Sequence, residues 1–175
     1  MPIIAKAGGG KSIPTHPDGQ YGSTCLDVVD MGMVESTWQG TTKTRHRIII
    51  RWYCGENFEA ADGTVQPLWV DKWFTLSLHE HSSLRPFLES WRGRKFTEAE
   101  LGGFDIETLV GAPALIQVSH NVVGDKTYAN VDACIRLPKG MVAPVVPSDY
   151  VRVCNRPPKD DTKPGRAADD DGLPF

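Results

Sequence analysis

The sequence predicts a mainly β domain, a small five-stranded barrel with one helix between the third and fourth strands. Three observations predict it: runs in which apolar and polar side chains alternate, one stretch with helical spacing, and segments rich in glycine and proline at both ends. A chain of 175 residues is long enough for one domain with a hydrophobic core and a tail. We expect a flexible leader at 1–20, the domain at 21–140, and a proline-rich linker with an acidic tip at 141–175, which we expect to be disordered.

The strands are predicted at residues 21–33, 43–53, 68–78, 114–120 and 127–137. The second and third alternate with the period of two that a half-buried strand requires. The last two are joined by a predicted hairpin at 123–126, and the interval 55–67 is expected to be a long loop. The side chains assigned to packing alone are Ile48, Ile50, Trp52, Phe74, Leu76, Ile116, Val118, Val131 and Ile135.

A helix is predicted after the third strand. Leu84, Phe87, Leu88 and Trp91 follow the spacing i, i+3, i+4, i+7, which places them on one apolar stripe, and Ser83 is expected to cap the helix. A capping box at 97–100 predicts a second, short helical turn. The resulting order, three strands, a helix and two strands, is that of the OB-fold, a five-stranded Greek-key barrel.

Composition excludes several classes of protein. The net charge of -3 excludes a uniformly basic coat, so binding of a polyanion requires a local patch. No apolar run has the length of a membrane span and no apolar signal core is present, so we expect a cytoplasmic protein with no membrane partner. The four cysteines are far apart and form no CxxC pair, which argues against a zinc ribbon or a redox dithiol.

Two local motifs point to chemistry that their context does not support. Residues 5–12 (AKAGGGKS) match a relaxed phosphate-binding loop, but Pro14, Pro17 and Gly19 prevent the helix that such a loop must open. His79 and His81 have no identifiable further ligands for a metal. We therefore expect no enzyme activity, no metal and no cofactor.

The predicted sheet carries a face that mixes cations with aromatic rings. Cations neutralise phosphates and aromatic rings stack on unpaired bases, a combination typical of proteins that bind single-stranded nucleic acid. The alternative is that these rings pack beneath the helix or the long loop. The candidate residues are Lys43, Arg45, Arg47, Arg51, Tyr53, Trp69, Trp73, Tyr128 and Arg136.

The last seven residues form a second candidate site, because an acidic run precedes an apolar tripeptide that ends in Phe175. A terminal aromatic side chain and its carboxylate suit an apolar pocket with a basic rim on a partner protein. The residues concerned are Asp169, Asp170, Asp171, Leu173, Pro174 and Phe175.

This tip resembles the acidic C-terminal tip of bacterial single-stranded DNA-binding proteins, apart from the additional Gly172. Residues 75–101 (TLSLHEHSSLRPFLESWRGRKFTEAEL) are similar to a family of small phage-encoded proteins of replication and recombination modules, regarded as OB-fold binders of single-stranded DNA. The resemblance covers roughly 20–140. It implies phage origin, action in the host cytoplasm, recruitment of replication or repair proteins through the tip, and competition of the tip with DNA for the basic groove.

We therefore expect a non-catalytic protein that binds single-stranded DNA without sequence preference, in DNA replication, recombination or repair. Two alternatives stay open. One is a protein-interaction adaptor of the replication machinery, and the other is a single-strand annealing protein or recombination mediator. The sequence does not decide whether the chain forms a homo-oligomer, whether it prefers DNA or RNA, or how large its binding site is.

Overall fold

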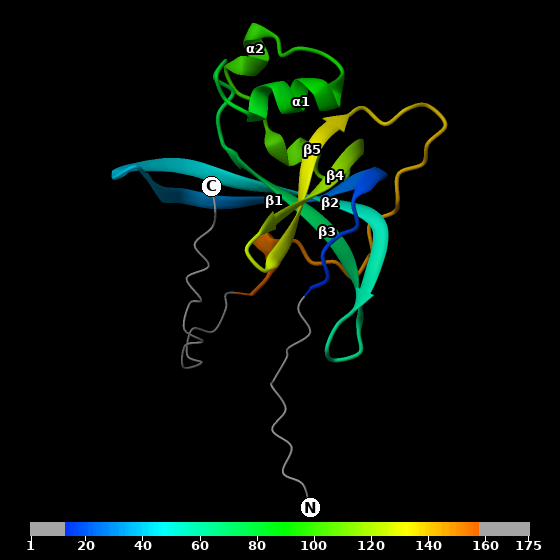
Figure 1. Ribbon diagram of the computed structural model, residues 1–175. Coiled ribbons are helices and arrows are strands. Elements are labelled where there is room, and N and C mark those ends of the chain that lie inside the picture. The colour runs from blue at the N-terminus through cyan, green and yellow to red at the C-terminus, as the bar shows by residue number, and fades with distance from the viewer. Residues whose placement is uncertain (1–12, 158–175) are drawn as a thin grey trace, which may run out of the picture.

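The structure is a computed structural model that describes residues 13–157, and it is mainly β (Figure 1). The strands are β1 (Gly19–Trp38), β2 (Thr41–Glu59), β3 (Val65–Thr75), β4 (Pro113–Val123) and β5 (Lys126–Ile135). The helices are α1 (Leu84–Arg92), α2 (Glu98–Leu101) and two 3₁₀ turns, η1 (Ile106–Leu109) and η2 (Val153–Asn155).

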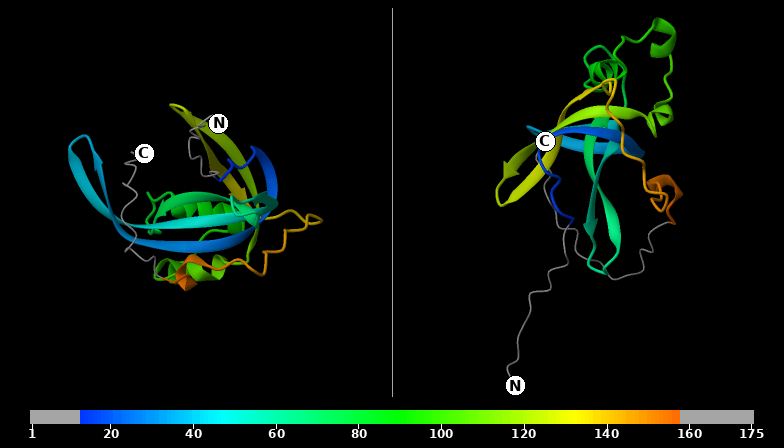
Figure 2. Two further views of the ribbon diagram at one scale, coloured as in Figure 1. Left: turned by 90° about the horizontal axis from the view of Figure 1, so that it is seen from below. Right: turned by 90° about the vertical axis from the view of Figure 1, so that its right-hand side faces the viewer.

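All five strands belong to one antiparallel sheet, in the order β3-β2-β1-β4-β5. The sheet curls into a half-barrel that brings its two outer strands, β3 and β5, into contact. Figure 2 shows this curvature in the view from below. Within the described residues β3 and β5 are not paired as strands, so a seam remains between them. The predicted mainly β class is confirmed.

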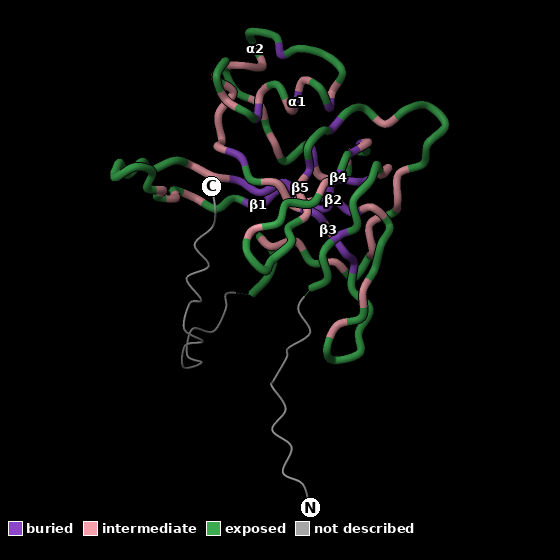
Figure 3. The backbone as a smooth tube through the Cα atoms, in the orientation of Figure 1, coloured by how far each residue is buried: buried purple, intermediate pink, exposed green. Residues whose placement is uncertain are grey.

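The core lies inside the curl, under α1. Ile48, Ile50 and Trp52 of β2 and Phe74 of β3 are at most 1% exposed, as the alternation predicts. The predicted stripe of α1 packs on them, with Leu84, Leu88 and Trp91 buried and Phe87 partly buried. In Figure 3 the residues coloured as buried follow the centre of the sheet. Fully burying such a side chain contributes about 1.5–3 kcal/mol.

The start of α1 differs from the prediction, since Ser83 makes no side-chain cap. Its neighbour Ser82 instead accepts a hydrogen bond at Oγ from the Arg85 amide, 3.4 Å away. Gly93 ends the helix with a φ of 72°, a left-handed conformation that glycine adopts without strain. The predicted capping box of α2 is present, with Thr97 and Glu100 bonded reciprocally.

Beyond the sheet, β1 and β2 continue as a two-stranded arm, residues 30–46, which projects to the left in Figure 1. Gln39 and Gly40 form its turn with φ of 48° and 77°, the positive values that a tight two-residue hairpin requires. The sequence does not predict this arm, since the expected strands end at residue 33 and begin at residue 43. Its side chains are mostly exposed, so they carry little of the apolar alternation that marks a strand.

The predicted long loop at 55–67 is wrong. β2 continues to Glu59 and β3 begins at Val65, so only a short turn joins them. An irregularity in the pairing between Tyr53 and Asn57, where Gly55 has a φ of 91°, breaks the alternation from which the strand would be recognised.

A second irregularity changes the faces of β5. The register with β4 shifts between Gln117 and Val118, which leaves one extra residue in β5 near Asp132. A one-residue insertion moves all later side chains to the opposite face. Cys134 is therefore buried, whereas Ile135, which the sequence predicts in the core, is 45% exposed.

Segments at both ends of the described chain lie against the sheet. Residues 144–156, here called the strap, cross the outer face of β1 and β2, and Thr24 Oγ1 donates to the Pro144 carbonyl at 2.6 Å. Within the predicted leader, His16 is buried and β1 already begins at Gly19. The acidic tip and the phosphate-loop motif lie outside the described residues.

Candidate functional site

An open groove of about 500 Å³ lies along the seam between β3 and the β4–β5 hairpin. Trp69, Trp73 and Tyr128, three of the predicted aromatic residues, all line it. Trp73 is 39% exposed, Tyr128 is 37% exposed, and Trp69 is half-buried. We call it the seam groove, and its complete lining is Ile13, Pro14, Thr15, His16, Trp69, Val70, Asp71, Trp73, Asn121, Thr127, Tyr128, Ala129 and Asn130.

Strand geometry explains why the rings of β3 face outward. Val70 and Phe74 point into the core, so Trp69 and Trp73, one residue away in each case, lie on the opposite face. Trp73 is paired with Ile49 of β2, and Trp69 with Tyr53. The seam stays accessible because no further strand covers β3 on this side within the described residues.

Arg47 provides a cation beside the groove. Its Cζ atom lies 5.7 Å from the ring centre of Trp73, in cation–π range. Its Nε atom is buried and has no hydrogen-bond partner among the described residues. The guanidinium group next to Trp73 therefore keeps one N–H donor that is not hydrogen-bonded within the described residues.

Arg51, by contrast, is occupied. Its Nε and Nη2 atoms donate to both oxygens of Asp71 at 2.7 and 2.9 Å, and its guanidinium stacks on Trp69 at 4.5 Å. Burial lowers the pKa of Arg51, but its hydrogen bonds to Asp71 and the charge of that carboxylate outweigh this effect and raise the pKa overall. With its charge compensated in this way, Arg51 fixes the orientation of Trp69 and is not open to a phosphate.

Tyr53 also lies away from solvent. It is 5% exposed, and its hydroxyl donates to Asn57 Oδ1 at 3.2 Å. A ring enclosed to this degree has no free face on which a base could stack.

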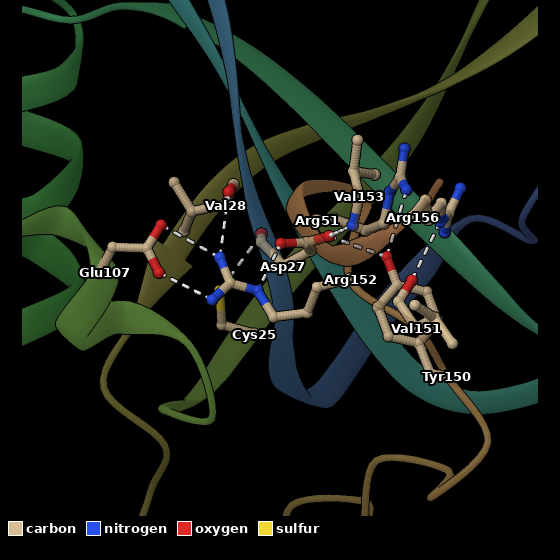
Figure 4. Close-up of polar contacts among 10 residues, drawn as sticks. All are labelled: Cys25, Asp27, Val28, Arg51, Glu107, Tyr150, Val151, Arg152, Val153 and Arg156. Atoms are coloured by element: carbon tan, nitrogen blue, oxygen red, sulfur yellow. Dashed lines mark hydrogen bonds and ion pairs between the residues drawn. The ribbon is translucent and has the colours of Figure 1, made fainter. Parts of the chain in front are cut away.

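The strap explains why the Arg51 end of this face is covered (Figure 4). The carboxylate of Asp27 is fully buried and accepts hydrogen bonds from Arg152 Nε, the Tyr150 hydroxyl and the Val153 amide at 2.9, 3.1 and 2.9 Å. Arg152 also donates to both oxygens of Glu107, and its pKa is raised by the hydrogen bonds to Glu107 and Asp27. The outer face of β1 and β2 is therefore closed at this point.

Tyr150 links this network to the groove. Its ring meets that of Trp69 edge-on, with ring centres 6.2 Å apart, and its hydroxyl also accepts a hydrogen bond from Arg51 at 3.3 Å. Trp69 is thus held between Arg51 and Tyr150.

Lys43 and Arg45 lie on the exposed arm, on the same side of β2 as Arg47. They line a hollow together with Trp38, which is 65% exposed. Sequence reasoning missed Trp38. The signal that could have found it is a tryptophan placed directly before the Gln39–Gly40 turn, where no core is available to bury it.

Arg136 is not brought to the groove. The extra residue in β5 places it on the opposite face from Tyr128, and it lies near Gly93 at the end of α1. The prediction that Arg136 shares a face with Tyr128 is therefore wrong.

The histidine pair and the cysteines of the described residues form no recognisable chemical centre. The rings of His79 and His81 are 5.3 Å apart, and within residues 13–157 no three His, Cys, Asp or Glu side chains gather as a metal site. All four cysteines are free, and burial raises the pKa of Cys25 to about 12, so its thiol is un-ionised at neutral pH.

Comparison with protein-family models and with curated protein sequences finds no match. Among residues 13–157, no helix combines the length and hydrophobicity needed to cross a bilayer.

Proposed function

We propose that the chain is an OB-fold protein that binds single-stranded DNA through the seam groove and the arm. The order of the elements, with α1 between β3 and β4, supports the OB assignment, as does the contact between β3 and β5 that curls the sheet. The observation that carries the proposal is the placement of Trp69, Trp73 and Tyr128 in one open groove.

In this proposal the bases of the strand stack on these rings. Trp73 and Tyr128 come from the two strands that face each other across the seam, so a strand that follows the groove passes both. Each base stacked on an aromatic ring contributes about 1–3 kcal/mol, and every base has a flat face, so binding does not depend on sequence. Duplex DNA offers no unpaired base to these rings, and we expect it to bind more weakly.

Cations along β2 neutralise the backbone of the bound strand. Arg47 lies beside Trp73, and Lys43 and Arg45 continue on the same face along the arm toward Trp38. The interface then runs from the end of the arm to the seam. Since phosphate contacts release counterions, affinity falls as the salt concentration rises.

Action in replication, recombination or repair, in the cytoplasm of a host cell, belongs to the same proposal. Its support is the sequence resemblance and the tip at 169–175, which would recruit replication or repair proteins. The oligonucleotide titration described below distinguishes DNA binding from the adaptor alternative, in which the domain binds protein alone.

The test is a fluorescence titration of the full chain with oligo-dT at low salt. We expect quenching of tryptophan emission, and we expect Trp73→Ala and Tyr128→Ala each to weaken binding by about 5- to 150-fold, the equivalent of 1–3 kcal/mol. Arg47→Ala should also weaken binding, whereas Arg136→Ala, the matched control outside the groove, should not. Absence of binding by the unmodified chain would contradict the proposal and favour the adaptor.

A further inference from the structure

A second hollow, of about 470 Å³, lies between the strap and the turn that joins β2 to β3. Trp69 lines this hollow as well as the seam groove, so the two adjoin at its ring. Because Trp73 and Trp69 lie on the same outer face of β3, a strand of DNA that follows the seam groove past Trp69 reaches the second hollow. We call it the strap hollow, and the lining residues that matter here are Asp62, Val65, Trp69, Asp149, Tyr150 and Arg156.

The strap supplies a cation to this hollow. Arg156 Nε donates to the Val151 carbonyl at 3.0 Å, and its guanidinium carbon lies 5.6 Å from the ring centre of Tyr150 (Figure 4). Within residues 13–157 Arg156 forms no ion pair. A guanidinium group that is held in place and not neutralised is suited to a phosphate oxygen.

Two carboxylates line the same hollow. Thr64 donates from its hydroxyl and its amide to Asp62 Oδ1, at 2.6 and 2.9 Å. The hydroxyl bond, followed by the amide bond, lowers the pKa of Asp62, so this carboxylate is ionised at neutral pH. In the described part of the chain, Asp62 Oδ2 and both side-chain oxygens of Asp149 accept no hydrogen bond. Carboxylates repel a phosphate but accept from N–H groups, which in a nucleotide belong to the base.

The four bases differ in what they offer to a carboxylate. Cytosine, adenine and guanine each carry an exocyclic amino group, whereas thymine has a carbonyl oxygen where cytosine has its amino group. Asp accepts a hydrogen bond from the amino group of cytosine, but the same carboxylate meets a second acceptor in thymine. A hollow with an aromatic wall, one cation and two carboxylates therefore matches the flat face, the phosphate and the amino edge of one nucleotide.

From these contacts we propose that the strap hollow binds one further nucleotide of the single strand and prefers a base that carries an amino group. Arg156 contacts the phosphate, Trp69 and Val65 contact the base, and Asp62 or Asp149 accepts from its amino group. This inference rests on the proposed function and extends it. Stacking in the seam groove remains independent of sequence, and the strap hollow adds a preference at one end of the site.

The experiment compares oligo-dC with oligo-dT of equal length at neutral pH, using the full chain and the double variant Asp62→Asn/Asp149→Asn. The readout is the ratio of the Kd for oligo-dC to that for oligo-dT, because the stacking difference between the two bases is common to both proteins. This ratio should rise in the variant by about 2- to 12-fold, the equivalent of one hydrogen bond. Loss of negative charge alone would strengthen the binding of both oligonucleotides and leave the ratio unchanged. Glu80→Gln/Glu98→Gln, the matched control, removes two exposed carboxylates outside both hollows and should not alter the ratio.

The salt dependence of binding tests Arg156 separately. For single strands each phosphate contact contributes about 0.7 to the slope of log K against log salt, so Arg156→Ala should reduce the slope by about 0.7. Arg156→Lys should keep the slope, and so should Arg136→Ala, which lies outside both hollows.

An unchanged slope in Arg156→Ala, or an unchanged Kd ratio in Asp62→Asn/Asp149→Asn, would overturn this inference and leave the proposed function intact. Failure of the unmodified chain to bind either oligonucleotide would reject both.

Discussion

Asp27 shows how a single side chain determines what the outer face of the sheet can bind. It is fully buried, and within residues 13–157 the hydrogen bonds to its carboxylate come from the strap: from Arg152, Tyr150 and the Val153 amide. An unpaired carboxylate at this depth would be very costly, so the hydrogen bonds from the strap stabilise Asp27 in its buried position. In turn, Tyr150 is held against Trp69, which sets one wall of the seam groove.

We predict that Asp27→Asn lowers the free energy of unfolding by about 3 kcal/mol, because it breaks a buried ion pair and removes one of the two carboxylates that pair with Arg152 in the described residues. Urea denaturation measures this cost. Asp30→Asn is the matched control, since the Asp30 side chain is 66% exposed and pairs with His46 at 2.6 Å. Its cost should stay below about 1 kcal/mol. Equal costs for the two variants would contradict the role given to Asp27.

At the scale of elements, the connection between α1 and α2 is organised around Arg92 and Glu100. The Arg92 guanidinium lies 4.4 Å from the ring centre of Phe96 and 5.3 Å from that of Phe104. Glu100 accepts hydrogen bonds from Arg92 at 2.6 Å and from the Thr97 amide at 2.9 Å. The bond to Arg92, followed by that to Thr97, lowers the pKa of Glu100 to about 2.

A depressed pKa means that Glu100 stabilises the folded state only when ionised. Its contribution is complete above its unfolded value of 4.5 and disappears as the pH falls through about 2. We therefore predict that Glu100→Gln is less stable than the unmodified chain above pH 5, and that the difference narrows toward pH 2. Urea titrations across this pH range measure it, and a difference independent of pH would contradict the prediction.

The elements also show what alternation alone can predict. The spacing of apolar residues predicts the core faces of β2 and β3 and the apolar stripe of α1. Buried positions repeat every two residues in a strand and every three or four in a helix. The extra residue in β5 and the irregularity after Tyr53 leave no mark on composition. The sequence therefore predicts Ile135 and Arg136 on the wrong faces, and a loop at 55–67 where β2 and β3 continue.

For the candidate site, the same alternation predicts that the aromatic rings on β3 face outward. It does not predict which residues surround these rings to form the groove. The contacts that build the groove and cover Arg51 join residues far apart in the sequence, and two of them, Thr15 with Thr127 and Arg152 with Asp27, span more than one hundred positions. Local sequence patterns do not predict contacts between residues so far apart. The sequence therefore predicts which strands carry the site, and the structure determines which part of their surface is open.

For the molecule as a whole, the curled sheet leaves two exposed features on one continuous face, the arm and the seam. β2 connects them, because Lys43 and Arg45 on the arm share a face with Arg47 at the groove. With a net charge of -3, the chain as a whole does not attract DNA, so this local arrangement of cations and rings must supply the affinity.

The most direct test of this arrangement is a residue-resolved hydroxyl-radical footprint of the full chain, with and without oligo-dT, read by mass spectrometry. Trp38, Trp73 and Tyr128 should each be protected by the oligonucleotide. Trp52 and Trp91, 0% and 4% exposed, serve as internal references that should not change. Bound oligonucleotide with no protection at Trp73 and Tyr128 would contradict the central claim that bases stack in the seam groove.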